Sequence, residues 1–380
     1  MDADELASWL RLHLTPGVGP RLARKLLAAF GPPRQIFSQP PAALQQIVSE
    51  DLTAALRQPP AGLPEQFSHC LNWLALSRVD GVPRRILPLG DDDYPPQFLH
   101  TDDPPLLLFL MGRLELLRQC NSSLAIVGSR NPTPQGVLNA RQFARTLSDA
   151  GHTIVSGLAL GIDAAAHEGA LEAASERPEQ LLTLAVVGTG LDRVYPSQHR
   201  QLAHRIANHG ILLSEYLLGT PPLPENFPRR NRLISALSLG TLVVEAAVQS
   251  GSLITARLAV EQGKEVFAIP GSIHATQSRG CHALIRQGAK LVESAQDILE
   301  EIPAIRGAVL NEAAVEPVGP ATDSADPLLE ALGADPCSLD ALQARCGLPI
   351  PELQAHLMAL ELEGHVARLP GGLFQRLFQT

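Results

Sequence analysis

Glycine- and serine-rich turns, with arginines among them, are the residues of this sequence whose types and spacing suit phosphate binding. Each turn follows a stretch rich in Val, Ile, Leu and Ala, and together they are Gly128-Ser129-Arg130, Ser156-Gly157, Gly188-Thr189-Gly190, Ser250-Gly251-Ser252 and Pro270-Gly271-Ser272. Turns of this kind leave backbone N–H groups free at the start of a helix, where they bind anions. A single turn is also explained by the tight bend that glycine permits. The repetition favours a cradle for several phosphates.

A run of arginines lies in the segment FPRRNR at 227–232. Its charged members are Arg229, Arg230 and Arg232, with Asn231 between them. The planar guanidinium fork binds phosphates, and Phe227 or Tyr216 could stack a base. A charge run can also be no more than a solvated surface. If these side chains form a site together with Arg130, we expect them to lie at its rim and to make few core contacts.

The elements that must position these residues are predicted by the alternation of apolar and helical segments. Strands are expected at 124–129, 153–156, 182–188, 211–215, 241–246, 265–269 and 290–292, and helices at 134–150, 163–174, 196–209, 230–239, 252–262 and 279–287. This order predicts an α/β fold, a Rossmann-like doubly wound parallel sheet whose strands end at one shared rim. Two further apolar stretches, 85–89 and 106–111, are expected either to extend the sheet or to pack against its edge.

The segments on either side predict two smaller domains. Residues 1–80 read as a helical, SAM or helix-hairpin-helix-like domain with helices at 6–14, 20–30, 42–58 and 65–76. Pro16–Gly19 is either a phosphate-binding hairpin or a turn between packed helices. The α/β domain is expected over 85–302, a Pro-rich linker over 303–327 and a winged-helix-like domain over 328–380. The expected recognition helix at 351–363 has three glutamates and no Lys or Arg, which favours a protein contact or packing over DNA binding.

Composition limits the classes of partner. The net charge is −9, and residues 301–380 hold 4 Lys+Arg against 11 Asp+Glu, so most of the excess negative charge lies in this tail. Coating of duplex DNA by bulk positive charge is therefore disfavoured, and a nucleic-acid site must be local. The five cysteines form no Cys-x-x-Cys pair, so neither a metal site nor a disulfide framework is predicted. The acidic start and the lack of a long apolar run predict a cytoplasmic protein without a membrane partner.

Nucleotide cofactors are disfavoured by the motifs. The dinucleotide fingerprint G-x-G-x-x-G is missing after the first parallel strand, where GSRNPTPQG stands at 128–136. No P-loop G-x-x-x-x-G-K-[ST] occurs in the chain. We therefore predict no cofactor.

Six runs in order resemble the DNA-processing protein A family (DprA/Smf): AIVGSR at 125–130, SGLALGID at 156–163, GTGLD at 188–192, FPRRNR at 227–232, SGSLIT at 250–255 and FAIPG at 267–271. The resemblance implies a non-enzymatic homodimer that binds incoming single-stranded DNA in natural transformation. It also implies help in loading RecA recombinase past single-strand-binding protein. Arg130, Arg230, Asn231 and Arg232 would be strand contacts, and the motifs extend the expected site to Thr255. Leu160 stands where some members carry a lysine, so one cationic contact is missing.

An enzyme remains the alternative prediction. GTLVVE at 240–245 resembles the Gly-Thr-x-x-Glu part of nucleotide phosphoribohydrolases, in which the glutamate supports glycosidic cleavage. The Pro-Gly-Gly that begins their motif is Leu237-Ser238-Leu239 here, which weakens this interpretation. In a binder, Glu245 would orient Arg230 or Arg232, or accept a bond from Ser252.

Overall fold

The computed structural model describes residues 1–174, 176–302, 326–333, 336–369 and 371–378. At its centre is a nine-stranded sheet with the order β1-β2-β6-β5-β4-β3-β7-β8-β9. The strands are β1 (Arg84–Pro88), β2 (Leu107–Gly112), β3 (Ser123–Val127), β4 (Thr153–Ser156), β5 (Thr183–Val186), β6 (Ile211–Ser214), β7 (Ser238–Val243), β8 (Glu265–Ala268) and β9 (Lys290–Leu291). From β6 to β9 all neighbours are parallel, whereas β1 and β2 pair antiparallel. The predicted parallel sheet and its two-strand extension are thus confirmed.

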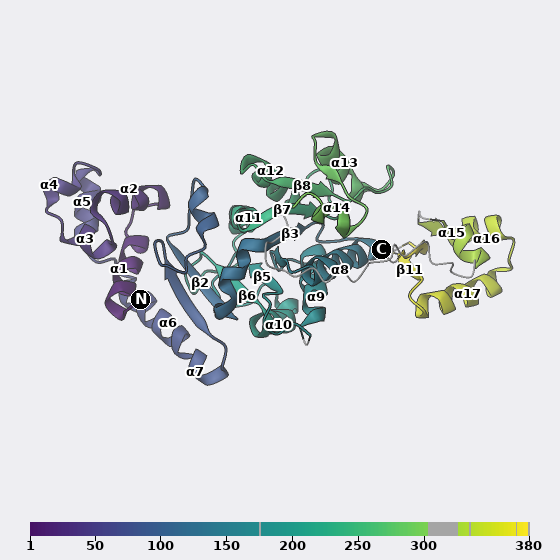
Figure 1. Cartoon of the computed structure of the whole chain (residues 1–380), viewed down its shortest axis with the longest axis horizontal. Coiled ribbons are helices and arrows are strands. Elements are labelled where there is room, and N and C mark those ends of the chain that lie inside the picture. Colours follow the sequence, from purple (N-terminus) through teal and green to yellow (C-terminus); the bar gives the residue numbers. More distant parts are fainter. Residues whose placement is uncertain (175, 303–325, 334–335, 370, 379–380) are drawn as a thin grey trace.

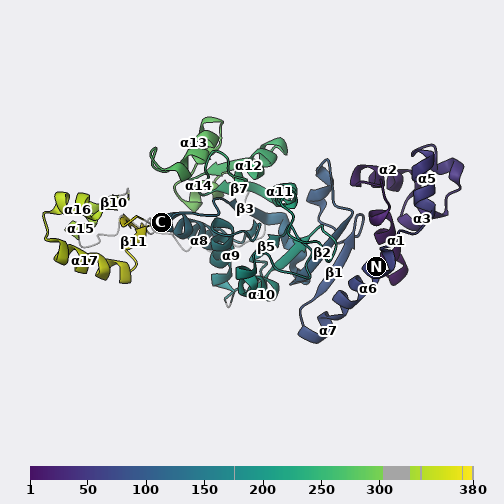
Figure 2. The same ribbon diagram turned by 180° about the vertical axis from the view of Figure 1, so that it is seen from behind.

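Helices cover both faces of the sheet (Figures 1 and 2). One face holds α8 (Pro134–Asp149), α9 (Ile162–Ala170), α10 (Arg200–His209) and α14 (Ala295–Leu299), and the other holds α11 (Asn226–Leu237), α12 (Ser252–Glu261) and α13 (Arg279–Arg286). Short 3-10 turns are η1 (Pro96–His100), η2 (Leu114–Ser122), η3 (Leu171–Ala173), η4 (Ser197–His199) and η5 (Thr276–Ser278). The central strands are buried on both sides, which explains why their sequences are continuous apolar runs.

The N-terminal helices pack against the antiparallel end of the sheet. They are α1 (Ala3–Leu14), α2 (Pro20–Phe30), α3 (Pro33–Ser38), α4 (Pro41–Leu44), α5 (Glu50–Arg57), α6 (Leu63–Ala75) and α7 (Ser77–Asp80). Trp73 of α6 meets Phe109 of β2 edge to face at 6.0 Å, so the two parts share one apolar core. The single helix predicted at 42–58 is wrong, because Ser49 accepts the Leu52 N–H and so begins α5 as a new helix.

The C-terminal segment forms the predicted winged-helix fold. Its elements are α15 (Pro327–Leu332), β10 (Cys337–Ser338), α16 (Leu339–Cys346), α17 (Ile350–Leu362), β11 (Val366–Leu369) and β12 (Leu373–Arg376). The three strands pair in the order β10-β12-β11 around a small core of its own. The predicted linker at 303–327 lies outside the described residues except for its last two.

Across the described parts of the chain, no helix combines the length and the apolar character needed to cross a lipid bilayer.

Candidate nucleic-acid interface

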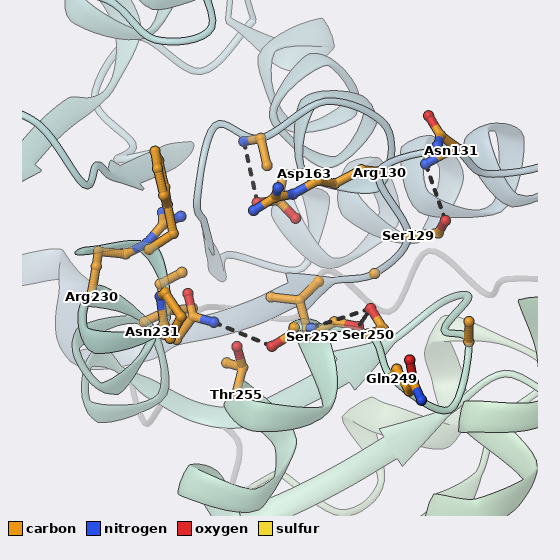
Figure 3. Close-up of a pocket in the computed structure, with 18 of the residues that line it drawn as sticks. Ser129, Arg130, Asn131, Asp163, Arg230, Asn231, Gln249, Ser250, Ser252 and Thr255 are labelled. Atoms are coloured by element: carbon orange, nitrogen blue, oxygen red, sulfur yellow. Dashed lines mark hydrogen bonds between the residues drawn. The ribbon is translucent and has the colours of Figure 1, made fainter. Parts of the chain in front are cut away.

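The candidate site lies where the order of the sheet reverses. β3 and β7 are neighbours at the centre of the sheet. The chain leaves β3 toward β4 on one side and leaves β7 toward β8 on the other, so the two connections run in opposite directions. In doubly wound sheets a crevice opens at this point, beyond the carboxyl ends of the strands. A cavity of about 470 Å³ occupies it (Figure 3).

The turn after β3 forms the first wall of this pocket. Ser129 holds the turn in two ways: its Oγ accepts the Asn131 N–H at 3.1 Å and its carbonyl accepts the Ile162 N–H at 3.1 Å. Arg130 is exposed and makes no ion pair with any described residue. Its guanidinium lies 5.9 Å from the centre of the Phe227 ring. One free cation beside an aromatic ring therefore borders the pocket.

The start of α12 forms the opposite wall. Ser250 Oγ accepts the Ser252 N–H at 3.3 Å and lies 2.7 Å from Ser252 Oγ, which fixes the turn into the helix. Asn231 of α11 donates from Nδ2 to the Gly251 carbonyl at 3.3 Å and joins the two helix starts. Thr255 is buried one turn further on. The first N–H groups of α12 already bond to Ser250 and Gly251, so it is the partial positive charge at the start of the helix that makes this wall suit an anion.

Arg230 lies at the buried end of the pocket and not on its rim. Only 3% of the residue is exposed, and its Nη1 donates to the Val186 carbonyl of β5. The guanidinium also packs on Gly157, where any side chain would collide with it. Burial lowers the pKa of Arg230 to about 10, and the nearby Asp163 opposes this shift. The expectation that rim side chains make few core contacts is wrong for this arginine.

Asp163 is the buried carboxylate that faces Arg230. It accepts the N–H groups of Gly157 at 3.1 Å and Ala159 at 3.3 Å, so it holds the turn after β4. Burial raises the pKa of Asp163, while Arg230 and the two N–H donors act in the opposite direction. The pair therefore supports the wall of the pocket from within.

The three arginines of the run point in different directions because they lie on α11, which begins earlier than predicted. The helix starts at Asn226 and not at Arg230, so the run lies on its first two turns. Successive residues of a helix are rotated by about 100°, which separates their side chains. Arg229 is exposed, whereas Arg232 is half-buried and forms ion pairs with Glu215 and, at 3.6 Å, with Asp103.

The structure brings ten of the predicted site residues together. The pocket is lined by Gly128, Ser129, Arg130, Phe227, Arg230, Asn231, Ser250, Gly251, Ser252 and Thr255. The other seven, Ser156, Gly157, Gly188, Thr189, Gly190, Arg229 and Arg232, lie outside its lining. Their part in binding remains a prediction. Among them, the Gly188 carbonyl accepts Asn226 Nδ2 at 3.1 Å, so the turn after β5 supports the start of α11.

Several residues around the pocket escaped the sequence prediction. Asn131, Asp163, Gln249 and Gln277 line it, and Gln277 also donates to the Asn131 carbonyl at 2.8 Å. Asp163 is the last residue of SGLALGID at 156–163, and this motif was the signal that could have identified it. The glutamines gave no comparable signal in the sequence.

Tyr195 adds a second aromatic ring beside Phe227. The two ring centres are 5.5 Å apart, and 48% of Tyr195 is exposed. Tyr216, which the sequence offered as a stacking residue, instead donates its hydroxyl to the Asn226 carbonyl at 3.0 Å. Phe227 is therefore the aromatic ring beside Arg130 in the pocket, and the exposed ring of Tyr195 lies next to Phe227, outside the pocket lining.

Glu245 is bound to neither of the arginines nor to Ser252. Its carboxylate accepts the Thr133 N–H at 2.9 Å and the Thr133 hydroxyl at 2.6 Å, at the start of α8. Gly136 packs directly on the same carboxylate. Burial raises the pKa of Glu245, and the two Thr133 donors oppose the shift. The roles expected for Glu245 in a binder are thus wrong, because it anchors the loop that follows Arg130.

Comparison with known proteins decides the family. The sequence model described as DNA recombination-mediator protein A matches residues 85–303, and the DprA winged helix domain matches residues 312–372. The chain belongs to the DNA recombination-mediator protein A family. Its relatives include Protein Smf of Escherichia coli, 44% identical over 294 residues that cover 76% of each chain. DNA processing protein DprA of Streptococcus pneumoniae is 47% identical over 56% of this chain and 72% of its own.

Two solved structures of DprA proteins are similar to this one. The X-ray structure of DNA processing protein A from Streptococcus pneumoniae has a TM-score of 0.60 and 35% identity, and covers 80% of this chain and 99% of that one. DNA processing protein A from Helicobacter pylori, described for its unique single-stranded DNA binding mode, has a TM-score of 0.51 and 32% identity. That alignment covers 58% of this chain and 97% of that one. The sequence-based family assignment is confirmed.

Proposed function

We propose that this chain binds single-stranded DNA at the pocket between the turn after β3 and the start of α12. It would bind mainly the sugar-phosphate backbone of the DNA and would show no sequence specificity. The observation that carries the proposal is the meeting of three kinds of group at one opening. Arg130 and the start of α12 suit phosphates, and the ring of Phe227, with Tyr195 beside it, suits the face of any base. Phosphate contacts and stacking on the face of a base carry no sequence information, so little sequence preference follows. The Helicobacter pylori relative supports the choice of a single strand.

We further propose that the protein works in the cytoplasm as a homodimer that helps load RecA recombinase onto the bound strand. Single-strand-binding protein would be displaced indirectly, as the strand passes to the recombinase. Family membership supports this role, since the family is that of DNA recombination mediators. The setting would be natural transformation or homologous recombination.

The geometry gives the hydrolase alternative little support. A glycosidic hydrolase needs a carboxylate that reaches its substrate. Both oxygens of Glu245 are instead bonded to Thr133, and the residue is not among those that line the pocket. We therefore propose no catalytic residue.

The proposal is tested by titrating the full chain with single- and double-stranded oligonucleotides of equal length at several salt concentrations. Single strands of different sequence should bind with similar affinity and more tightly than duplex. The logarithm of the affinity should fall by about 0.7 per logarithmic unit of salt for each neutralised phosphate. Equal affinity for duplex, or binding that does not respond to salt, would contradict the proposal.

A further inference from the structure

α17 is apolar on two opposite faces. Its inner face, Leu353, Leu357 and Leu360, is buried in the core of the winged helix. Its outer face is exposed and consists of Pro351, Ala355, Met358 and Leu362, a set we call the outer ridge. A surface helix of a globular protein normally has one apolar face, which packs on the core, and a polar face opposite it. The described residues cover only one side of this helix.

The outer ridge is continuous and well exposed. Its members follow one another at intervals of four, three and four residues, the spacing that aligns side chains along one face of a helix. Met358 is 63% exposed and Leu362 is 81% exposed. An aligned set of exposed apolar side chains is typical of an interaction surface, unlike the single apolar residues scattered over most proteins.

The charged residues of the α17 segment that flank the outer ridge are all negative. Helical spacing places Glu361 on one side of it and Glu352 and Glu363 on the other, and all three are exposed. α17 contains no Lys or Arg. Its one histidine, His356, is bound to Asp326 at 2.9 Å. A nucleic acid would be repelled by this surface, although α17 holds the position of a recognition helix.

We propose that the outer ridge of α17 is a docking surface for a protein segment that is apolar at its centre and carries Lys or Arg at its edges. Its apolar side chains would cover Met358 and Leu362, and its cations would pair with the glutamates. Methionine adapts well to partner surfaces because its side chain is flexible and polarisable. A second copy of α17 fits poorly, since pairing two outer ridges would bring the glutamates of both helices together. This surface lies outside the DNA-binding pocket and adds a partner to the proposed function.

The test begins by locating the partner on the full chain. Met358→p-benzoylphenylalanine places a photo-crosslinker on the outer ridge, and Val260→p-benzoylphenylalanine is the control, because Val260 is a helical position of matching exposure at 62%. Both proteins are made in the organism that encodes the chain and are irradiated there. Mass spectrometry then maps the crosslinked peptide. A synthetic peptide of the mapped segment is finally titrated against the purified full chain by fluorescence anisotropy.

The expected result is a protein segment that is captured through position 358 and not through position 260, with apolar residues flanked by Lys or Arg. The double variant Met358→Glu with Leu362→Glu should lower the affinity for the peptide by about tenfold or more. Glu361→Gln with Glu363→Gln should weaken it by about two- to fivefold, and Val260→Glu should not weaken it. Capture of nucleic acid, of a second copy of the chain, or of a segment without cations would overturn the proposal, as would no capture above the control. Peptide binding that both double variants leave unchanged would overturn it too.

Discussion

Arg130→Ala is the sharpest test of the pocket, because Arg130 is the cation that the structure leaves free there. Its side chain is exposed, forms no ion pair with a described residue and is not part of an apolar core. Removing it should therefore leave the free energy of unfolding almost unchanged. A charge-assisted hydrogen bond contributes about 1.5–3 kcal/mol, so the loss should weaken single-strand binding by roughly one to two powers of ten.

The same variant should change the response to salt. If Arg130 neutralises one phosphate, the slope of log affinity against log salt should become shallower by about 0.7. The assay is fluorescence anisotropy with a labelled oligonucleotide at several salt concentrations, beside thermal melts that check the fold. Arg205→Ala is a matched control, since Arg205 is exposed on α10 and lies outside the pocket. If Arg130→Ala binds with the affinity and slope of the parent, the strand does not pass through this pocket.

Three further predictions follow from the same geometry. Arg230→Ala should lower the free energy of unfolding by about 2–5 kcal/mol in denaturant titrations, because it removes a buried side chain and its bond to the Val186 carbonyl, and takes the nearby charge away from the buried Asp163; a fully stable variant would contradict the supporting role given to Arg230. Deletion of residues 325–380 should leave single-strand affinity unchanged or slightly higher, since it removes an acidic segment, and a large loss in a folded truncation would show that the winged helix binds DNA. Nucleoside monophosphates should release no free base in a chromatographic assay, and Glu245→Gln should perturb single-strand binding only modestly; turnover that this variant abolishes would instead identify a hydrolase.

The sheet was predictable because parallel strands buried on both faces have a simple sequence signature. Their continuous apolar runs and the turns behind them located seven strands and one rim. The sequence pattern did not show which of the turns at this rim lie next to each other, because their neighbours depend on the order of the strands in the sheet. β3 and β7 are neighbours, so Gly128–Arg130 and Ser250–Ser252 face each other across the pocket. β5 lies two strands from β3, and its turn at Gly188–Gly190 stays outside the pocket.

The individual side chains were harder to predict, because their directions depend on where a helix begins. α11 starts at Asn226 and not at Arg230. All three arginines therefore lie on the helix, where adjacent residues face different sides, and Arg230 is on the buried side. Nothing in the run of arginines distinguishes Arg230 from Arg229, since both have the same chemistry and adjacent positions. Tyr195 was missed for a related reason. It comes to Phe227 from a distant loop, and only the tertiary fold makes the two rings neighbours.

The turn after β4 indicates how rigidly the pocket is built. Leu158 has a φ of 59°, a left-handed conformation that is costly for a residue with a side chain. Three contacts hold it there: the side chain is buried, its carbonyl lies 3.0 Å from His199 Nδ1, and Asp163 accepts the N–H groups of the residues on either side. Such strain persists only where the surroundings fix the backbone. A wall held in this way loses little freedom when a strand binds, so the binding energy of a few phosphate contacts is retained as affinity.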